Sequence, residues 1–466
     1  MVKRRKLPVW VAVCMVLMLS LPALVVQAPA VRAASAPPKP IFVATSGSDT
    51  TGNGSSTRPF ATISHAVSAA ASAQTVIVEP GTYQEMVLVT RQITLMSSTL
   101  QPSTTVINAT GKPVGIAVVG PSAAGTVIEG FTVTGANNEG IFVQDSNDVV
   151  VDNNFVSNNA VNVTPGLGEV KGIQLTGTSS STVAGNTVVG NGYGGIGVTD
   201  DGPVDASWNA TAAPSSGIPS GTANPGNANL ISGNVVANNH PNHCAIVVSA
   251  YDPGEGVSDN VVSYNNVVDN QNGVIVAADT PNTIAVNNTV TYNSILNNGE
   301  GGVVVHSNAP GDVVTKNSIT YNVISSNGYL PVLEGIIIGG EGSVPVTDTT
   351  IVGNLFQNEA VAVQIVLGTN TMVGGNTIGA TVKLAYNGTV TQIGPTSTGT
   401  ATATTTVTQT TVSTQTSPAN ATSTAGASSS SGGLSFTLAL FTAVGTLIVG
   451  LIAGMIVRPI REASSK

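Results

Sequence analysis

Charged side chains are scarce in this sequence. Only 8% of its 466 residues are Asp, Glu, Lys or Arg, against roughly 25% in an ordinary soluble protein. The formal net charge is −9, and the few Lys residues of the central part are scattered. A nucleic-acid-binding surface needs clustered basic residues, so the sequence gives no support to nucleic-acid binding. Because few groups titrate, we also hypothesise that the surface suits an acidic exterior.

Cysteine and helical periodicity are also nearly absent. Of the two Cys residues, Cys14 lies in an N-terminal apolar run that we expect to be removed, which leaves Cys244 alone. An internal disulfide is then excluded, so stability must come from stacking and hydrogen-bond ladders. The near absence of helical periodicity between residues 75 and 393 argues against a helical solenoid. Hydrophobic residues make up 41% of the chain, which excludes a disordered protein.

The sequence is rich in one repeated phrase, which is Gly, an apolar residue and a short β-branched run. Gly140-Ile141-Phe142-Val143 is one copy, and the copy at Ala245 has Ala in the Gly place. Most successive copies are about 23 to 33 residues apart, a period typical of solenoids. The other copies begin at Gly115, Gly172, Gly195, Gly273, Gly302 and Gly335.

A second phrase lies between these copies. It is an Asn followed by two mostly apolar residues, with another Asn four or five positions later. Short strands bounded by Asn and Gly predict an all-β fold, the coils of a parallel β-helix, and Asn at the bends tolerates left-handed backbone. We interpret the Asn series as structural. Its members are Asn154, Asn186, Asn234, Asn322 and Asn354, with Asn158, Asn191, Asn238, Asn327 and Asn358 as the second residues.

The two ends of the chain indicate a membrane-anchored surface protein. Basic residues, a long apolar run and the cleavage site at Ala33 predict a signal peptide, with an uncleaved signal anchor as the alternative. A Thr/Ser-rich stretch predicts an O-glycosylated stalk, and a long uncharged apolar run before a basic tail predicts a transmembrane helix with its tail inside. The predicted segments are 1–33 signal peptide, 34–74 N-terminal cap, 75–394 β-helix, 395–433 stalk, 434–457 transmembrane helix and 458–466 cytoplasmic tail.

Residues 41–98 contain the most specific local pattern, which reads FVATSGSD, RPFATISHAV and TVIVEPGTYQE. Thr62 is a candidate N-cap for a short helix that covers the open end of the solenoid. These segments resemble the N-terminal module, a domain of unknown function, of secreted right-handed parallel β-helix (pectin-lyase-like) proteins. The resemblance implies a right-handed coil with three sheets, of about 10–11 coils here. It is hardly specific for an activity.

Several acids follow the Gly-apolar strands, including Asp145, Asp200 and Asp201. The paired Asp residues and His306 faintly resemble segments of polygalacturonases, and enzymes of this fold place catalytic or calcium-binding carboxylates along one sheet. No Arg-x-Lys segment follows to hold a sugar carboxylate. The alternative is that these acids cap turns, in which case no cofactor is needed.

Two further groups of residues are candidates for binding. His240, His243 and Cys244 are potential Cu or Zn ligands by residue type, or else a turn and a core strand. The aromatic residues Trp208, Tyr193 and Tyr251 are candidate sugar-stacking platforms, or else they hold a loop against the coil wall.

The sequence therefore predicts a glycosylated cell-surface β-helix that binds glycans or other envelope polymers as an adhesion or structural ectodomain. The expected partner is a polysaccharide or a surface glycoprotein, since extended solenoid surfaces favour extended ligands. The alternative is a membrane-tethered polysaccharide-active enzyme, either a glycoside hydrolase or a polysaccharide lyase. Convergence of the acids and His306 in one groove would favour the enzyme.

Overall fold

The computed structural model describes residues 38–161, 170–200, 224–239, 244–328, 334–339, 344–378, 383–392 and 397–398. The predicted signal peptide, transmembrane helix and cytoplasmic tail lie outside these residues, as does the predicted stalk apart from Ser397 and Thr398. No helix within the described ranges is long and apolar enough to cross a membrane.

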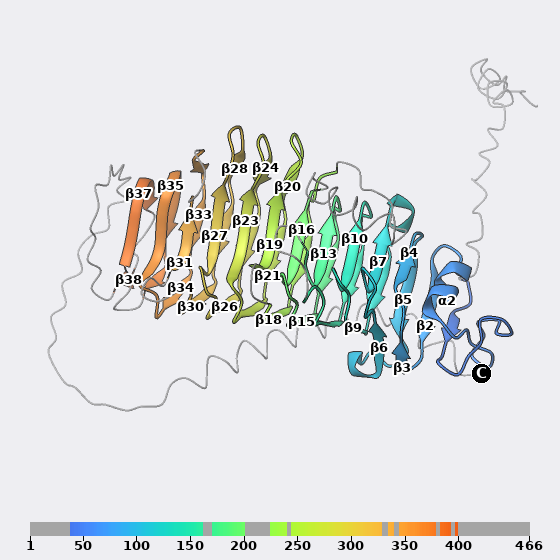
Figure 1. Cartoon of the computed structure of the whole chain (residues 1–466). Coiled ribbons are helices and arrows are strands. Elements are labelled where there is room, and N and C mark those ends of the chain that lie inside the picture. Colours follow the sequence, from blue (N-terminus) through green and yellow to red (C-terminus); the bar gives the residue numbers. More distant parts are fainter. Residues whose placement is uncertain are drawn as a thin grey trace, which may run out of the picture. The chain divides into compact units, whose positions relative to one another are not determined.

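The repeated Gly phrase forms one column of parallel strands, here called the Gly column (Figure 1). Consecutive copies pair in register, with Ile173 opposite Ile196 and Ile196 opposite Ile246. The copy with Ala in the Gly place is therefore a full member. The column consists of β4 (Val87–Val89), β7 (Ile116–Val119), β10 (Ile141–Gln144), β13 (Ile173–Thr176), β16 (Ile196–Thr199), β19 (Cys244–Ala250), β23 (Asn272–Ala278), β27 (Val303–Ser307), β31 (Glu334–Ile338) and the first parts of β35 (Val361–Gly374) and β37 (Lys383–Gln392).

The next strand of each coil belongs to a second column, here called the middle column. It consists of β1 (Ile41–Val43), β2 (Gln74–Val78), β5 (Ile93–Ser97), β8 (Val127–Glu129), β11 (Val150–Asp152), β14 (Thr182–Ala184), β17 (Leu230–Ser232), β21 (Val261–Ser263), β25 (Thr289–Thr291), β29 (Ser318–Thr320), β33 (Thr350–Val352) and the later parts of β35 and β37.

The third column is a 12-stranded sheet, here called the Asn column because Asn residues flank its strands. Its strands are β3 (Gly81–Tyr83), β6 (Thr105–Asn108), β9 (Thr132–Thr134), β12 (Phe155–Ser157), β15 (Thr187–Val189), β18 (Val235–Ala237), β22 (Asn266–Val268), β26 (Ser294–Leu296), β30 (Val323–Ser325), β34 (Leu355–Gln357), β36 (Thr377–Ile378) and β38 (Ser397–Thr398). Among the described residues the Gly column has 11 strands and the Asn column 12, in line with the prediction of about 10–11 coils.

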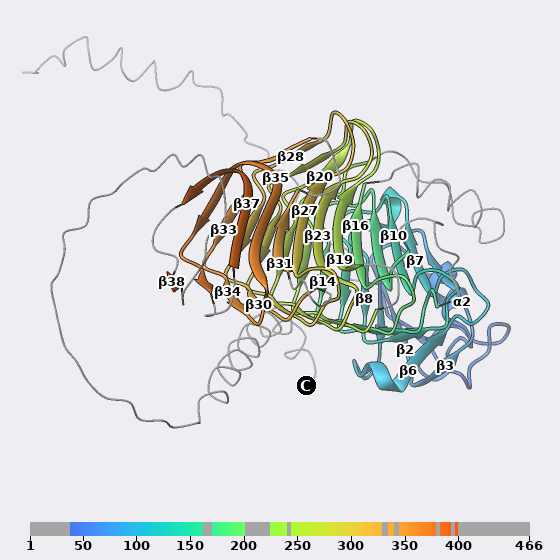
Figure 2. The same ribbon diagram turned by 60° about the vertical axis from the view of Figure 1, so that its left-hand side comes forward.

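A fourth, short column occurs in the later coils, between the Gly and middle columns (Figure 2). The three-sheet coil that the resemblance implied is therefore widened in this region. The additional strands are β20 (Gly256–Ser258), β24 (Ile284–Val286), β28 (Val313–Thr315) and β32 (Val346–Thr347).

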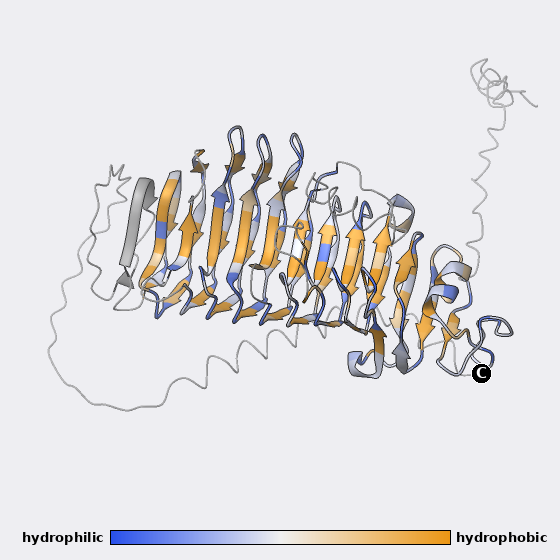
Figure 3. Ribbon diagram, in the orientation of Figure 1, coloured by the Kyte–Doolittle hydropathy of each residue, from blue (hydrophilic) through white to orange (hydrophobic). Residues whose placement is uncertain are grey.

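Inward-pointing Val and Ile residues from all columns form one continuous core, and the strands are correspondingly apolar in Figure 3. Alternate residues of a strand point to opposite faces, as in the buried, intermediate, buried pattern of Val87–Val89. At the copies that have Gly, a Cβ would lie too close to its neighbours. A Cβ on Gly172 would lie 2.7 Å from Nδ2 of Asn191 and 2.8 Å from Cγ1 of Val188.

The Asn series forms ladders along the corners of the coils, which confirms its structural interpretation. At each step Nδ2 of one Asn donates to Oδ1 of the Asn in the next coil, as from Asn265 to Asn293 at 3.0 Å. The same Oδ1 accepts the backbone N–H of Asn265 at 2.9 Å. One ladder comprises Asn154, Asn186, Asn234, Asn265, Asn293, Asn322, Asn354 and Asn376. A second comprises Asn159, Asn191, Asn239, Asn270, Asn298 and Asn327.

The corners use two consecutive positions, which the sequence pattern did not separate. Asn158, Asn238 and Asn358 have left-handed backbone, with φ between 53° and 55°. The residue after each of them points inward, and Asn159 and Asn239 are fully buried ladder members. Thus one Asn makes the bend and the next makes the ladder.

The predicted N-terminal helix is α2 (Ile63–Ala69), and it packs its buried Ile63, Ala66 and Val67 on the first coil (Figure 1). Thr62 is its N-cap, as predicted, and accepts a hydrogen bond from the N–H of His65. The Asp49 carboxylate in turn accepts hydrogen bonds from the backbone N–H and the hydroxyl of Thr62. Two short 3₁₀ helices, η1 (Pro102–Thr104) and η2 (Pro121–Ala123), complete the helical elements of the described residues.

Candidate functional site

Asp200 follows β16 at the edge of the Gly column and is fully buried. Its Oδ1 accepts the N–H of Tyr251 at 2.6 Å, and its Oδ2 accepts the N–H of Asp252 at 3.0 Å. This carboxylate therefore joins its coil to the next one. The next residue, Asp201, which was also a candidate site residue, lies outside the described residues.

Asp145 occupies the corresponding place after β10, with a left-handed φ of 51°. Its Oδ1 accepts a hydrogen bond from Nδ2 of Asn224 at 2.7 Å. Two coil steps separate Asp145 from Asp200, because β13 lies between β10 and β16. The two acids share one edge of the stack, about 10 Å apart along it.

His306 lies further along the same edge, on β27, in register with Ala277. Its Nδ1 is 2.9 Å from Oδ1 of Asn308 and 3.9 Å from Oδ1 of Asp279. Asn308 also donates to Asp279 at 2.6 Å, and the Ser249 hydroxyl donates to the other oxygen of Asp279. Because the Asn308 oxygen can only accept, the Nδ1 atom of His306 carries a hydrogen, and in the neutral tautomer of this geometry Nε2 is the acceptor.

The aromatic candidates of the Gly column are largely buried. Tyr193 is 6% exposed and packs in a cluster on the outer side of the strands, together with Phe142. Tyr251 is 8% exposed. Trp208 lies outside the described residues. Neither of the two described rings offers an open face for stacking.

Lys171 is a further residue of this outer face that sequence reasoning passed over as one of the scattered lysines. It is fully buried, and its Nζ lies 5.4 Å from the ring centroid of Tyr193, a cation–π distance. It is the one Lys or Arg between Lys112 and Lys316. Its place directly before Gly172 was the available signal.

The predicted metal ligands are only partly described. Cys244 begins β19 and is buried, whereas His240 and His243 lie outside the described residues. Within the described ranges, no three His, Cys, Asp or Glu side chains are grouped so as to hold a metal ion.

Three tyrosines that the sequence reasoning missed form an exposed stack at the corner between the middle and Asn columns. Tyr264, Tyr292 and Tyr321 are 50%, 42% and 52% exposed. Neighbouring ring centroids are 5.2 Å apart, with interplanar angles of 4° and 10°. The signal was the tripeptide of Ser or Thr, Tyr and Asn, which recurs 28 and 29 residues apart.

Each of these tyrosines directly precedes a ladder Asn and has left-handed backbone, with φ of 55° to 57°. The same place in other coils belongs to Asn or Gly, residues that adopt this conformation readily. We call this line of left-handed residues the corner row. Its members are Gly130, Asn153, Gly185, Gly233, Tyr264, Tyr292, Tyr321, Gly353 and Gly375.

Two carboxylates lie beside the corner row on adjacent coils of the middle column. Asp152 pairs in register with Glu129. Burial raises the pKa of Glu129, and the Asp152 carboxylate raises it further. Burial also raises the pKa of Asp152, against the opposing hydrogen bond from Asn153.

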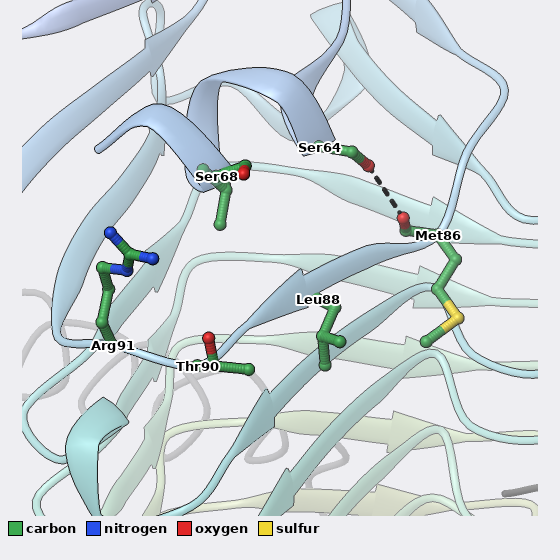
Figure 4. A pocket seen from close by; sticks show the side chains of 7 residues that line it. Ser64, Ser68, Met86, Leu88, Thr90 and Arg91 are labelled. Atoms are coloured by element: carbon green, nitrogen blue, oxygen red, sulfur yellow. Dashed lines mark hydrogen bonds between the residues drawn. The ribbon is translucent and has the colours of Figure 1, made fainter. Parts of the chain in front are cut away.

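A pocket of about 340 Å³ lies between α2 and β4, at the N-terminal cap (Figure 4). The Ser64 hydroxyl donates to the Met86 carbonyl oxygen at 2.9 Å across its edge. Arg91 lines the other end and donates to the Ala70 carbonyl oxygen at 2.8 Å. These bonds attach the helix to the first coil, and the pocket contains none of the predicted site residues.

Comparison with known proteins concerns mainly the fold. The family described as "Right handed beta helix region" matches residues 97–211. No curated protein matches the chain significantly. A family 28 exopolygalacturonase from Yersinia enterocolitica is 12% identical, with a TM-score of 0.47, over 75% of this chain and 78% of that one. An alginate lyase from a Paenibacillus strain is 16% identical, with a TM-score of 0.44, over 76% and 99%. A pectate lyase is 13% identical, with a TM-score of 0.43, over 79% and 82%.

The family match covers coils whose strands stack in parallel and in register, with Asn ladders at their corners. The right-handed coil of the matching family agrees with the handedness that the resemblance of the N-terminal segments implied. The chain is a right-handed parallel β-helix protein.

Proposed function

We propose that this protein binds a glycan or another envelope polymer through the exposed stack of Tyr264, Tyr292 and Tyr321. The signal peptide, stalk and transmembrane helix predicted from the sequence would display this surface outside the cell. The observation that supports the proposal is that three large aromatic rings are exposed, stacked and held in left-handed backbone.

The left-handed conformation is unfavourable for Tyr, at roughly 1–2 kcal/mol for each residue. Stacking of the rings offsets part of this cost, at about 0.5–1.5 kcal/mol for each pair. Core packing gives no reason for Tyr at these positions, because the rings lie outside the core. In two later coils the corresponding residues are Gly353 and Gly375. A strained backbone kept at an exposed aromatic site favours a functional role.

The arrangement favours a polymer over a small ligand. The rings follow one another along the coil stack at 5.2 Å, so the surface repeats in one dimension. Aromatic edges and phenol hydroxyls present both apolar and hydrogen-bonding groups, which suits a sugar. Repeating solenoid surfaces of this kind bind extended partners.

The experiment that tests the proposal measures binding of the purified full-length chain to a panel of soluble polysaccharides. A variant in which all three tyrosines are replaced by Asn should fold, since Asn tolerates left-handed backbone, and should lose at least tenfold in affinity. Val313→Asn is the matched control, because Val313 is 45% exposed on the fourth column. Unchanged binding by the triple variant would refute the role of the stack, and a wild-type protein that binds no polymer would refute the function.

The geometry of His306 favours a second candidate function, a polysaccharide-active enzyme. Asn308 and Asp279 hold Nδ1 of the imidazole, so that Nε2 of the neutral tautomer would serve as the proton acceptor that a general base requires. The test is release of reducing sugar or unsaturated product by the wild-type chain and by His306→Gln. Release that is abolished in the variant supports this candidate, whereas absence of release by the wild type rejects it.

A further inference from the structure

The proposed polymer surface has one open aromatic face. We propose that a neutral polysaccharide lies along the corner row, with one sugar ring packed on the face of Tyr264 above Gly233 and Gly185. Its hydroxyl groups would donate to the Asp152 carboxylate. This inference rests on the proposed function and names the class of its ligand.

The other faces of the tyrosine stack are covered. Tyr292 lies between its two neighbours, and a Cβ on Gly353 would lie 2.5 Å from Cε1 of Tyr321, so that ring lies against the backbone of the next coil. On the opposite side the row continues with Gly233. Among the described residues, a Cβ there would meet only the backbone nitrogen of Gly185, at 4.0 Å. No residue of the described ranges therefore fills the space in front of Tyr264, which is 50% exposed.

The floor of this space is flat because Gly233 and Gly185 are consecutive members of the corner row and both are exposed. Leu230 and Val235 flank Gly233 on the same coil, and each is 38% exposed. Exposed apolar side chains beside an aromatic face match the C–H groups of a sugar ring, which pack on such a face while its hydroxyls point sideways.

The far end of the floor carries hydrogen-bond acceptors. Oδ1 of Asp152 lies 2.9 Å from the place where a Cβ on Gly185 would be, and Glu129 is its neighbour in register. Asn153 closes the row there, because its Nδ2 donates to the Leu100 carbonyl oxygen at 2.8 Å. Three coil steps separate Asp152 from Tyr264, which is about 14 Å along the stack. This length accommodates a few consecutive sugars.

The charge of the surface selects against acidic polymers. Between Lys112 and Lys316 the sequence has one basic residue apart from His, Lys171, and its side chain is fully buried at the Gly column. A uronate chain on the floor would place its carboxylates beside Asp152 and Glu129 without a cation to offset the repulsion. A neutral sugar instead donates hydroxyl hydrogens to these acceptors.

The test uses calorimetric titration of the purified full-length chain with cellohexaose, mannohexaose and hexagalacturonate. We expect one of the neutral oligosaccharides to bind at least tenfold more tightly than hexagalacturonate. Gly233→Asn should keep the fold, because Asn153 holds the same place with φ of 54°, but its side chain fills the floor and should weaken binding at least tenfold. Asp152→Asn should weaken binding less and reduce the discrimination against hexagalacturonate.

Gly375→Asn is the matched control, since Gly375 is an exposed member of the corner row beyond the other end of the stack. Its binding should equal that of the wild type. If the triple tyrosine variant loses binding but Gly233→Asn does not, the site at Tyr264 is wrong and the proposed function stands. Equal or tighter binding of hexagalacturonate would overturn the choice of a neutral ligand. If no oligosaccharide or polymer binds the wild type, the proposed function fails as well.

Discussion

Asn327 donates both its backbone N–H, at 3.1 Å, and its Nδ2, at 3.0 Å, to Oε1 of Glu359. Glu359 takes the place of the next Asn in the second ladder and is only 2% exposed. Every Asn of that ladder donates in the same direction along the stack. The ladder therefore ends with its N–H groups directed at a carboxyl group.

Glu359 should make the fold less stable above neutral pH. Burial raises its pKa to about 7, although the hydrogen bonds from Asn327 oppose the shift. Because the folded-state pKa lies above the usual 4.5, the folded protein binds the proton more tightly. This contribution is fully present below pH 4.5 and is lost as the pH rises through about 7, at a cost of roughly 1–3 kcal/mol. Glu359→Gln should remove this dependence in denaturant unfolding curves recorded across this range. Identical pH profiles for both proteins would contradict the prediction.

Removing one ladder residue should destabilise the protein strongly. Asn293→Ala deletes the acceptor of the Asn265 N–H and Nδ2 and the donor to Asn322. Buried groups left without partners cost about 1–3 kcal/mol each, so we expect a loss of roughly 3 kcal/mol or more in the free energy of unfolding.

The control for this measurement is Asn266→Ala. Asn266 is exposed at the start of β22 in the neighbouring coil and should change stability by less than about 0.5 kcal/mol. Equal effects of the two substitutions would show that the ladder contributes nothing particular.

The N-terminal cap should loosen in acid. Burial alone would raise the pKa of Asp49, but hydrogen bonds from Thr62 and Ala61 lower it below the usual 3.8. The stabilisation by the ionised carboxylate is therefore present above pH 3.8 and is lost as the pH falls below it. Asp49→Ala should accelerate hydrogen exchange at the Ala61 and Thr62 amides at neutral pH, whereas in acid the two proteins should converge. Ser46→Ala, on the same loop, should leave the exchange rates unchanged.

The tyrosine stack should contribute little to stability. Tyr292→Gly relieves a left-handed backbone but removes two stacking contacts, and these effects are of similar size. We expect the thermal midpoint to change by only a few degrees while polymer binding falls. A large loss of stability would mean that the stack is structural and that the exposure of its rings does not indicate binding.

The coil architecture was predictable because its causes are local and repeat along the chain. Gly172 has to be Gly where the ladder Asn191 approaches it, and this constraint recurs as a visible phrase. The fourth column was not predicted, because the sequence period does not reveal it. β19 and β23 lengthen to seven residues in this region, but the repeat length stays at 28 to 31 residues.

The candidate site was less predictable, because single side chains take their roles from neighbours in other coils. Asp200 was expected from its place after a strand, but its bonds to the backbone of Tyr251 and Asp252 depend on the next coil. Tyr264 and Tyr292 follow a period that the sequence does show, but their exposure and stacking depend on which side of the corner they point to.

The Asn ladders also make the coil the unit in which this protein can change length. Asn265 and Asn293 occupy the same ladder position in successive coils, 28 residues apart. Removal of residues 265–292 would join Tyr264 to Asn293 with the columns in register, and a duplication of that segment would insert a whole coil. Each such event subtracts or adds one Tyr of the exposed stack, so a chain of this kind can lengthen its exposed aromatic surface ring by ring without redesigning its core.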